Sequence, residues 1–141
     1  MTPTEIDTAA MDRLVDEHFA FEATDDVDGV VATLAEDATH HLVGSPSGPL
    51  IGRDRIRTFY EELFATLRGE HVEPVDRWHG DGLLVDESMW TGHIADARLF
   101  GLPGRSGLAT FRLLHVFELR GDTIATEKVW SDLAAIDRSL S

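Results

Sequence analysis

The sequence predicts an α+β fold, in which helices cover the concave face of a curved antiparallel sheet. Two observations carry this prediction. Apolar residues recur at three- and four-residue steps up to residue 67 and at every second residue from residue 83, the periods of amphipathic helices and half-buried strands. Helices grouped before a run of antiparallel strands are typical of this class. No repeat or linker interrupts the chain, so residues 1–141 are expected to form a single domain.

Three helices are expected in the first half. An apolar stripe that includes His18 and Glu22 predicts a helix over roughly residues 5–24, and Asp25 or Asp26 can cap a shorter one that buries Val27 to Leu34. The third begins near Gly52. Its buried side has the clearest amphipathic pattern of the chain: Ile56, Phe59, Tyr60, Leu63, Phe64 and Leu67. A short strand candidate, residues 39–43, separates the second and third helices.

Four strands are expected in the second half. Alternation of apolar and polar residues predicts strands over 71–79, 83–95, 108–120 and 123–132. Glycine-containing turns at 80–82 and 121–122 join the first pair and the last pair as hairpins, and a loop through 100–104 joins the two hairpins. Leu133, Ile136 and Leu140 indicate one or two helical turns at the end. A strongly bent sheet with helices across its mouth leaves a cavity of the kind that holds small ligands.

Composition excludes several classes of function. The formal charge is −14, from 26 acidic and 12 basic residues, so nucleic acid and anionic membrane surfaces are unfavourable partners. The absence of cysteine excludes disulfides, thiolate metal sites and a cysteine nucleophile. No long apolar run or basic leader is present, so a cytoplasmic protein is expected. His40 and His41 are adjacent and point to opposite sides of a strand, and no metal-ligand motif occurs, so no metal is expected.

Strand parity selects His115 as the leading candidate for chemistry. Successive side chains of a strand face opposite sides of the sheet. One face of residues 108–120 carries an almost entirely apolar row, which must be buried: Phe111, Leu113, His115, Phe117 and Leu119. An imidazole in such a row needs a hydrogen-bond partner, and burial should lower its pKa unless an acid lies nearby. A core histidine bonded to a backbone carbonyl is the alternative interpretation.

The last strand offers the acid. Glu127 and Val129 lie on one of its faces, while Lys128, Trp130 and Asp132 lie on the other. Either Glu127 or Asp132 could reach His115, since the inward face of this strand is not fixed by its pattern. A histidine paired with a carboxylate in a dry pocket can act as a general acid or base near neutral pH.

Other side chains are expected to line the cavity. His18 shares the buried stripe of the first helix, and Tyr60 lies on the buried side of the third helix. On residues 83–95 we favour the face that turns Trp90 inward, which brings Asp86 with it. Phe111, Phe117 and Trp130 are further wall candidates, and each of these residues could instead only fill the core.

Diffuse motifs over most of the chain resemble the SnoaL-like polyketide cyclase branch of the NTF2-like superfamily. They occupy residues 34–38, 52–60, 90–93, 100–105, 109–124 and 127–132, and they include the segments FGLPGR and EKVWSD. The resemblance implies an NTF2-like cone, in which a curved antiparallel sheet is covered by three helices from the first half. It also implies a homodimer paired through the outer sheet face, where Leu114 and Val116 are available.

By the same resemblance, relatives use pocket acids and bases without metal or organic cofactor. In the cyclases a histidine on the penultimate strand, at the position of His115, works with an aspartate that directly follows the tryptophan of the last strand. Here Ser131 follows Trp130, so Glu127 or Asp132 would have to replace that aspartate.

The expected function is therefore that of a cofactor-independent enzyme acting on an apolar cyclic or polyketide-like small molecule as a cyclase, isomerase or dehydratase. In this reading His115 is the acid or base, Glu127 or Asp132 is its partner, and His18 or Tyr60 steadies a developing oxyanion. One alternative is an epoxide hydrolase of the limonene epoxide hydrolase type, using Asp86, Arg98 and Asp132. Another is a non-catalytic module for small-ligand binding or dimerisation.

Overall fold

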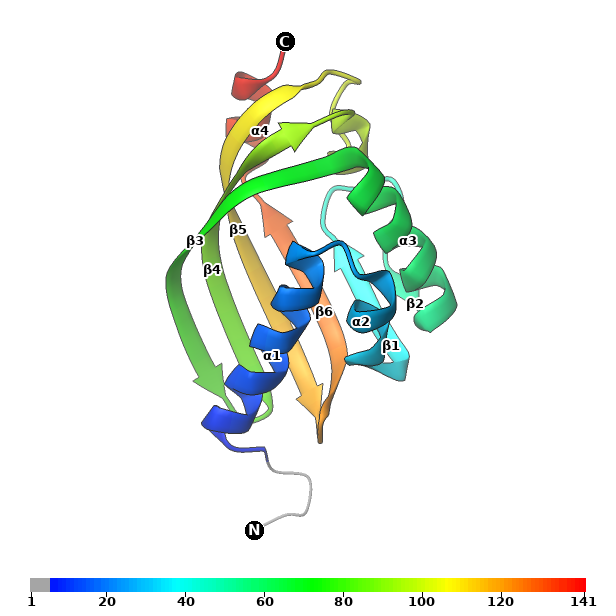
Figure 1. The fold of residues 1–141 in the computed structure, drawn as a ribbon, viewed down its shortest axis with the longest axis vertical. Helices are drawn as coiled ribbons and strands as arrows, with labels where there is room; N and C mark the ends of the chain where they lie inside the picture. Colours follow the sequence, from blue (N-terminus) through cyan, green and yellow to red (C-terminus); the bar gives the residue numbers. More distant parts are fainter. Residues whose placement is uncertain (1–5) are drawn as a thin grey trace.

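The computed structural model describes residues 6–141, and it confirms the α+β class (Figure 1). Its helices are α1 (Thr8–Ala23), α2 (Val27–Ala32), α3 (Arg53–Thr66), the short 3₁₀ helix η1 (Ala97–Phe100) and α4 (Leu133–Ser139). Its strands are β1 (Leu34–Leu42), β2 (Leu50–Ile51), β3 (Leu67–Gly80), β4 (Leu83–Ile94), β5 (Gly107–Arg120) and β6 (Thr123–Ser131).

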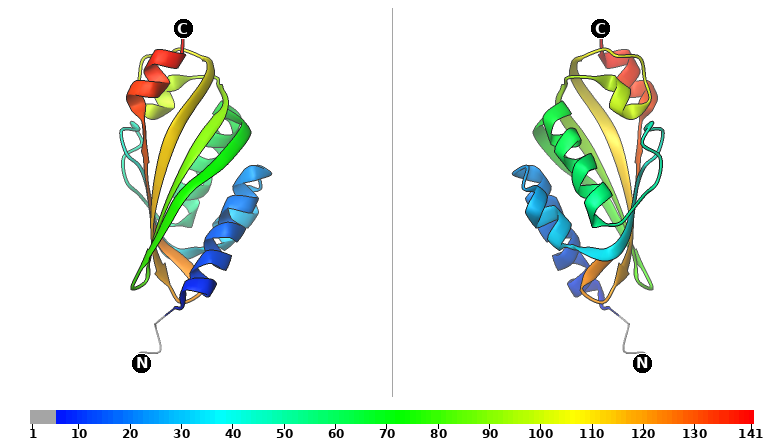
Figure 2. Two further views of the ribbon diagram at one scale, coloured as in Figure 1. Left: turned by 90° about the vertical axis from the view of Figure 1, so that its left-hand side faces the viewer. Right: turned by 90° about the vertical axis from the view of Figure 1, so that its right-hand side faces the viewer.

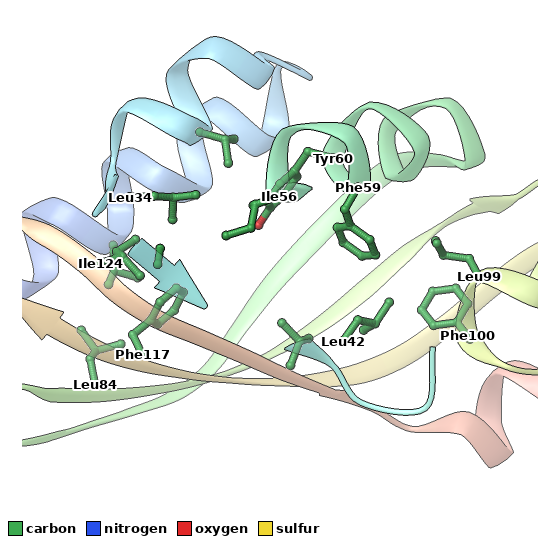
Figure 3. Packing of buried hydrophobic residues seen from close by; sticks show 14 of the residues in the cluster. Leu34, Leu42, Ile56, Phe59, Tyr60, Leu84, Leu99, Phe100, Phe117 and Ile124 are labelled. Carbon is green, nitrogen blue, oxygen red and sulfur yellow. The ribbon is translucent and has the colours of Figure 1, made fainter. Parts of the chain in front are cut away.

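The long strands form one strongly bent sheet, and α1, α2 and α3 lie across its concave side (Figure 2). Core residues lie between these two layers, where Tyr60 and Ile56 of α3 face the sheet (Figure 3). Aspartates fix both N-terminal helices, because Asp7 accepts a hydrogen bond from the backbone N–H of Ala10, and Asp26 accepts one from Gly29. Among the helices of residues 6–141, none combines the length and apolar run needed to cross a bilayer.

The sheet differs from the expected antiparallel one at a single pairing. Its strand order is β2-β1-β6-β5-β4-β3, and β1 runs parallel to β6. This pairing places His40 beside Glu127 and Leu42 beside Val129, although more than 80 residues separate the members of each pair. The parallel arrangement is possible because the chain crosses from β1 to β6 through α3 and four intervening strands. It joins the two halves of the sequence at the centre of the fold.

Element boundaries differ from the expected ones in four places. Leu34 begins β1 rather than extending α2, and it is buried there. Strand β3 begins at Leu67, four residues earlier than the pattern indicated, since its exposed edge position leaves no clean alternation. The loop through Phe100 contains η1, and the two-residue strand β2 was not expected. The terminal helical turns are confirmed as α4.

Cross-strand register orders the inner face into rows. One row aligns Phe117 with Glu127 and His40, and the next aligns Asp86, His115 and Val129. The row beyond contains Ser88, Leu113 and Ser131, and the row after it contains Trp90 and Phe111. Polar residues therefore occupy the middle of the concave face, and aromatic residues follow toward the end at which α4 lies.

Close packing of two strands depends on Gly92. A side-chain carbon at this position would lie 2.3 Å from the carbonyl oxygen of Arg68 and 2.6 Å from the Trp90 ring. Neither distance is compatible with ordinary contact, and the first involves backbone that cannot rotate away. Gly92 thus allows β3 and β4 to approach while the Trp90 ring packs over Gly92 and its partner Gly69.

We predict that Gly92→Ala lowers the free energy of unfolding by about 1–3 kcal/mol, because β3 must shift to relieve the overlap. Urea-induced unfolding followed by circular dichroism measures the change. Gly80→Ala is the matched control, since its new carbon would be 3.4 Å from the nearest atom, an ordinary contact. Equal stabilities for the two variants would contradict this account of the strand packing.

Candidate active site

A cavity of about 660 Å³ lies between the concave face of the sheet and helices α1 and α3. This volume is within the range of pockets that hold drug-sized molecules. Much of the wall is aromatic: Phe19, Phe59, Phe64, Trp90, Phe100 and Phe111. The polar groups gather at the middle of the sheet and on α1. The cavity can therefore bury an apolar body and present ionisable groups to one part of it.

Glu127 of β6 is at the centre of a cluster of polar side chains. Its side chain is 1% exposed, and its Oε1 accepts a hydrogen bond from the Tyr60 hydroxyl at 2.9 Å. The Nε2 of His18 lies 3.1 Å from the same oxygen. The Nε2 atoms of His40 and His115 lie 3.8 Å from Oε1 and 3.9 Å from Oε2. Burial alone would raise the pKa of Glu127, but the charge of His18 holds it below the usual range, so the carboxylate is ionised.

His18 carries the compensating positive charge. Its Nδ1 lies 2.8 Å from Thr33 Oγ1, and the Thr33 hydroxyl donates its own proton to the Val30 carbonyl at 2.6 Å. Nδ1 must therefore be the donor to Thr33, while Nε2 faces Glu127. Burial would lower the pKa of His18, but the carboxylates of Glu127 and Glu22 raise it to about 9. Both ring nitrogens are protonated at neutral pH.

Glu22 adds a second carboxyl group to the same imidazole. It lies one helical turn after His18 on α1, its Oε1 is 3.6 Å from His18 Nε2, and it borders the cavity. Burial raises the pKa of Glu22 to about 7, with the neighbouring Glu127 charge adding to the rise and the His18 charge opposing it. Near neutral pH Glu22 therefore exchanges its proton readily, whereas Glu127 stays ionised.

His115 and His40 complete the cluster as neutral rings. His115 stacks on Phe117 with an angle of 4° between the planes and meets the edge of Phe19, while His40 packs against Phe59 and Tyr60. Burial lowers the pKa of both imidazoles to about 4, more than the attraction of Glu127 offsets. Each ring can donate from one nitrogen and accept at the other without carrying charge.

A separate cluster of charged side chains forms the wall of the cavity beside β3. The Arg77 guanidinium lies 2.9 Å from Asp86, 3.0 Å from Asp12 and 2.9 Å from Asp16. Asp86 is buried on β4, and burial raises its pKa despite the hydrogen bond from Arg77. The three carboxylates come from α1 and β4, so Arg77 ties the exposed strand β3 to both elements and closes this side of the cavity.

The sequence profile of the SnoaL-like domain matches residues 15–127, which is most of the chain and includes both Glu22 and Glu127. The chain belongs to the SnoaL-like family. No curated protein is similar enough in sequence to be counted as a relative.

Solved structures share the fold of this SnoaL-like chain at low identity. A Jannaschia sp. CCS1 protein described as a SnoaL-like polyketide cyclase is 16% identical with a TM-score of 0.79, covering 100% of this chain and 96% of its own. A Silicibacter sp. TM1040 protein described as a polyketide cyclase is 20% identical with a TM-score of 0.76, covering 94% and 96%.

An LEH-like epoxide hydrolase from M. tuberculosis is 18% identical with a TM-score of 0.73, covering 93% of this chain and 89% of its own. Ketosteroid isomerase-like and NTF2-like folds also occur among the similar structures. At such identities the likeness shows the NTF2-like fold, and the chemistry must be argued from the site.

The SnoaL-like chain brings most of the predicted site residues together. His115, Glu127, Tyr60, Asp86, Trp90 and Phe111 all border the cavity. His18 and Phe117 are fully buried behind this surface and do not border it. His18 is therefore placed to orient and charge-balance Glu127 rather than to touch a ligand.

Three predicted residues lie elsewhere. Asp132 is exposed and accepts a hydrogen bond from the backbone N–H of Ala135, so it caps α4 and cannot partner His115. Trp130 is 41% exposed on the outer face of the sheet, with the Lys128 ammonium 5.6 Å from its ring. Arg98 is paired with Asp96 at the surface. Strand parity explains the first two positions, since Glu127 turns inward and Trp130 and Asp132 therefore do not.

Several residues of the site were missed in the sequence. Glu22 had a detectable pattern, because it follows His18 by four residues on one helical stripe. His40 had none, since its place beside Glu127 depends on the parallel pairing of β1 with β6. Arg77 lies on a strand without clear alternation. Ser131 borders the cavity next to Leu113, with its hydroxyl buried and without a partner.

We predict that the pKa values of the buried histidines are shifted in opposite directions from the usual value of 6.5. His18 should keep both protons up to about pH 9, whereas His115 and His40 should stay neutral down to about pH 4. Imidazole nitrogen chemical shifts, measured by NMR between pH 4 and pH 10, give the three values. Glu127→Gln removes the counter-charge and should bring the pKa of His18 down. An unchanged His18 titration in that variant would contradict the ion pair.

Proposed function

We propose that the protein is a cofactor-independent enzyme that moves a proton next to a carbonyl group in an apolar cyclic or polyketide-like small molecule, leading to cyclisation, isomerisation or dehydration. The observation that carries the proposal is the pair of carboxyl groups on one imidazole. Glu127 and Glu22 lie 3.1 Å and 3.6 Å from His18 Nε2, yet their environments push their pKa values in opposite directions. Such separation is typical of acid/base sites.

The roles follow from protonation and access. Glu22 borders the cavity and has a pKa near neutrality, so its ionised form accepts the proton of the C–H bond adjacent to the carbonyl. The electron pair of that bond moves toward the carbonyl oxygen, which becomes an enolate oxygen. A neutral His115 can donate its N–H to this oxygen. Glu22 then returns its proton to another atom of the product.

His18, Glu127 and Tyr60 act as positioning residues in this scheme. The buried Glu127 carboxylate keeps His18 protonated, and the His18 charge limits the rise that burial causes in the pKa of Glu22. Burial and the adjacent Glu127 charge raise the pKa of Tyr60 well above its usual value, so its hydroxyl remains a donor. We assign proton transfer to Glu22 rather than to His115 because an imidazole with a pKa of about 4 is a weak base.

Hydrogen exchange tests the proposed proton transfer without knowledge of the natural substrate. The wild-type protein should accelerate exchange of the protons beside the carbonyl in cyclic ketones such as 2-tetralone in D₂O, followed by NMR. Glu22→Gln should slow this exchange by about 10²–10⁴-fold, the usual contribution of one general base. The matched control is Glu62→Gln on the exposed side of α3. Equal rates for the two variants would remove Glu22 from the reaction.

The same assay has an expected pH profile. The rate should rise as pH increases through about 7, where Glu22 ionises, and should fall above about 9, where His18 loses its charge. In Glu22→Gln the rise in rate on the acidic side of the pH profile should disappear.

Epoxide hydrolysis is a second candidate, supported by the carboxylates on Arg77. Asp86 borders the cavity, is buried and has a raised pKa, and Arg77 lies between it and Asp16. Asp86 could activate a water molecule, while Arg77 and Asp16 assist opening of the oxirane. Hydrolysis of an apolar epoxide in H₂¹⁸O should then place the ¹⁸O label in the diol product. Asp86→Asn should abolish this hydrolysis. If neither exchange nor hydrolysis occurs, the domain is a ligand-binding module.

A homodimer is proposed through the outer sheet face. Trp78, Leu83, Leu108 and Trp130 are exposed there, and the half-buried Leu114 and Val116 lie among them. Patches of this kind mark association surfaces in soluble proteins. Light scattering at micromolar concentration should give twice the chain mass, and Trp130→Glu should shift the protein to monomer. A monomeric wild-type protein would rule out the dimer.

A further inference from the structure

Unsatisfied polar atoms single out the cavity from the rest of the molecule. Among residues 6–141, four buried side-chain atoms have no hydrogen-bond partner: His40 Nδ1, His115 Nδ1, Glu127 Oε2 and Ser131 Oγ. All four residues border the same cavity. Folded proteins leave few such atoms, and each one present needs an explanation, such as a bound molecule. Their shared location indicates that a ligand in the cavity supplies the missing partners.

Ser131 stands apart from the other three. His40, His115 and Glu127 belong to one cluster around the Glu127 carboxylate, whereas Ser131 lies in the next row of the sheet, opposite Leu113. His115 pairs with Val129, two residues before Ser131, so the two positions are diagonal neighbours. Such neighbours are separated by about 7–8 Å. Apolar Leu113 and Val129 are the other members of these two pairs.

The charges on the cavity wall favour a ligand without a carboxylate. The Arg77 guanidinium is already engaged by Asp12, Asp16 and Asp86. His18 is paired with Glu127 and does not border the cavity. Arg68, the other arginine on the wall, is exposed to solvent. An anionic group at Ser131 would thus be buried without a cation, whereas a neutral carbonyl or hydroxyl oxygen can exchange a hydrogen bond with the serine.

We propose that Ser131 is a second polar anchor of the ligand site and that the substrate is a neutral, apolar molecule of bicyclic size with an oxygen function at each end. One oxygen accepts a hydrogen bond from the His115 imidazole, and the other exchanges a hydrogen bond with the Ser131 hydroxyl. This assignment rests on the proposed function, since the first oxygen is the carbonyl beside which the proton moves. Ser131 then selects substrates by the position of their second oxygen, because a ligand that lacks it leaves the buried hydroxyl unpaired.

Two unreactive ligands test the anchor by binding alone. 2,6-Dihydroxynaphthalene carries a hydroxyl at each end of a rigid bicycle, and 2-naphthol lacks one of them. By calorimetry the wild-type protein should bind the diol about five- to tenfold more tightly, the usual effect of one net hydrogen bond. Ser131→Ala should reduce this preference to less than about twofold. In 6-hydroxy-2-naphthoate a carboxylate replaces one hydroxyl, and it should bind at least about tenfold more weakly than the diol.

The chain provides a matched control. Ser88 is a cavity serine in the same row, on the other side of Leu113, so Ser88→Ala should keep the preference for the diol. Ser131→Cys retains the side-chain volume and should lose the preference, which guards against a folding defect in Ser131→Ala. Thermal unfolding of each variant confirms that the domain is intact.

Several outcomes would overturn the proposal. The wild-type protein could fail to bind the diol at millimolar concentration, or bind it no more tightly than 2-naphthol. The preference for the diol could survive in Ser131→Ala or be abolished in Ser88→Ala. The naphthoate could bind as tightly as the diol. The result is separable from the proposed function, because binding requires no proton transfer. Glu22→Gln should lose ketone exchange and still prefer the diol. A preference without any exchange would leave the anchor standing and reject the proposed reaction.

Discussion

The buried ion pair between His18 and Glu127 is the constraint on which the site depends. A carboxylate that is 1% exposed must be paired and hydrogen-bonded, and here an imidazolium and a tyrosine hydroxyl meet that requirement. The pair also fixes its neighbours: the His18 charge disfavours a second positive charge on His115 or His40, while the Glu127 charge disfavours ionisation of Glu22. Together with burial, this one interaction keeps both histidines neutral and holds the pKa of Glu22 above its usual value.

Much of the fold could be predicted because its periodicities are local. The stripe of α3 and the alternation of β5 put Tyr60 and His115 on buried faces, and the structure places both at the cavity. The partner of His115 could not be chosen, because Glu127 and Asp132 lie on opposite faces of one strand and only tertiary packing decides which face turns inward. The parallel pairing of β1 with β6 is not local either, so His40 was not recognised.

The distribution of polarity shows how a shared fold supports a particular chemistry. The rows around His115 and Ser131 carry ionisable groups and hydroxyls, whereas Trp90 and Phe111 form an apolar wall beyond them. The position after the tryptophan of the last strand holds a serine, and the carboxylate is supplied four residues earlier by Glu127. Shifting an acid by four residues along a strand moves it by roughly 13 Å. One backbone can therefore carry an acidic group at different points along the same strand.

The pairing of β1 with β6 also bears on how the protein forms during synthesis. His18 and His40 leave the ribosome long before Glu127. The two histidines therefore lack their counter-ion at first, and β1 lacks the long strand that pairs with it. During this interval β1 has only the two-residue β2 beside it. Contacts between distant parts of a chain form slowly. Completion of the last hairpin is therefore the event that gives β1 its long neighbouring strand and gives His18 its counter-ion, so the sheet and the buried ion pair form together.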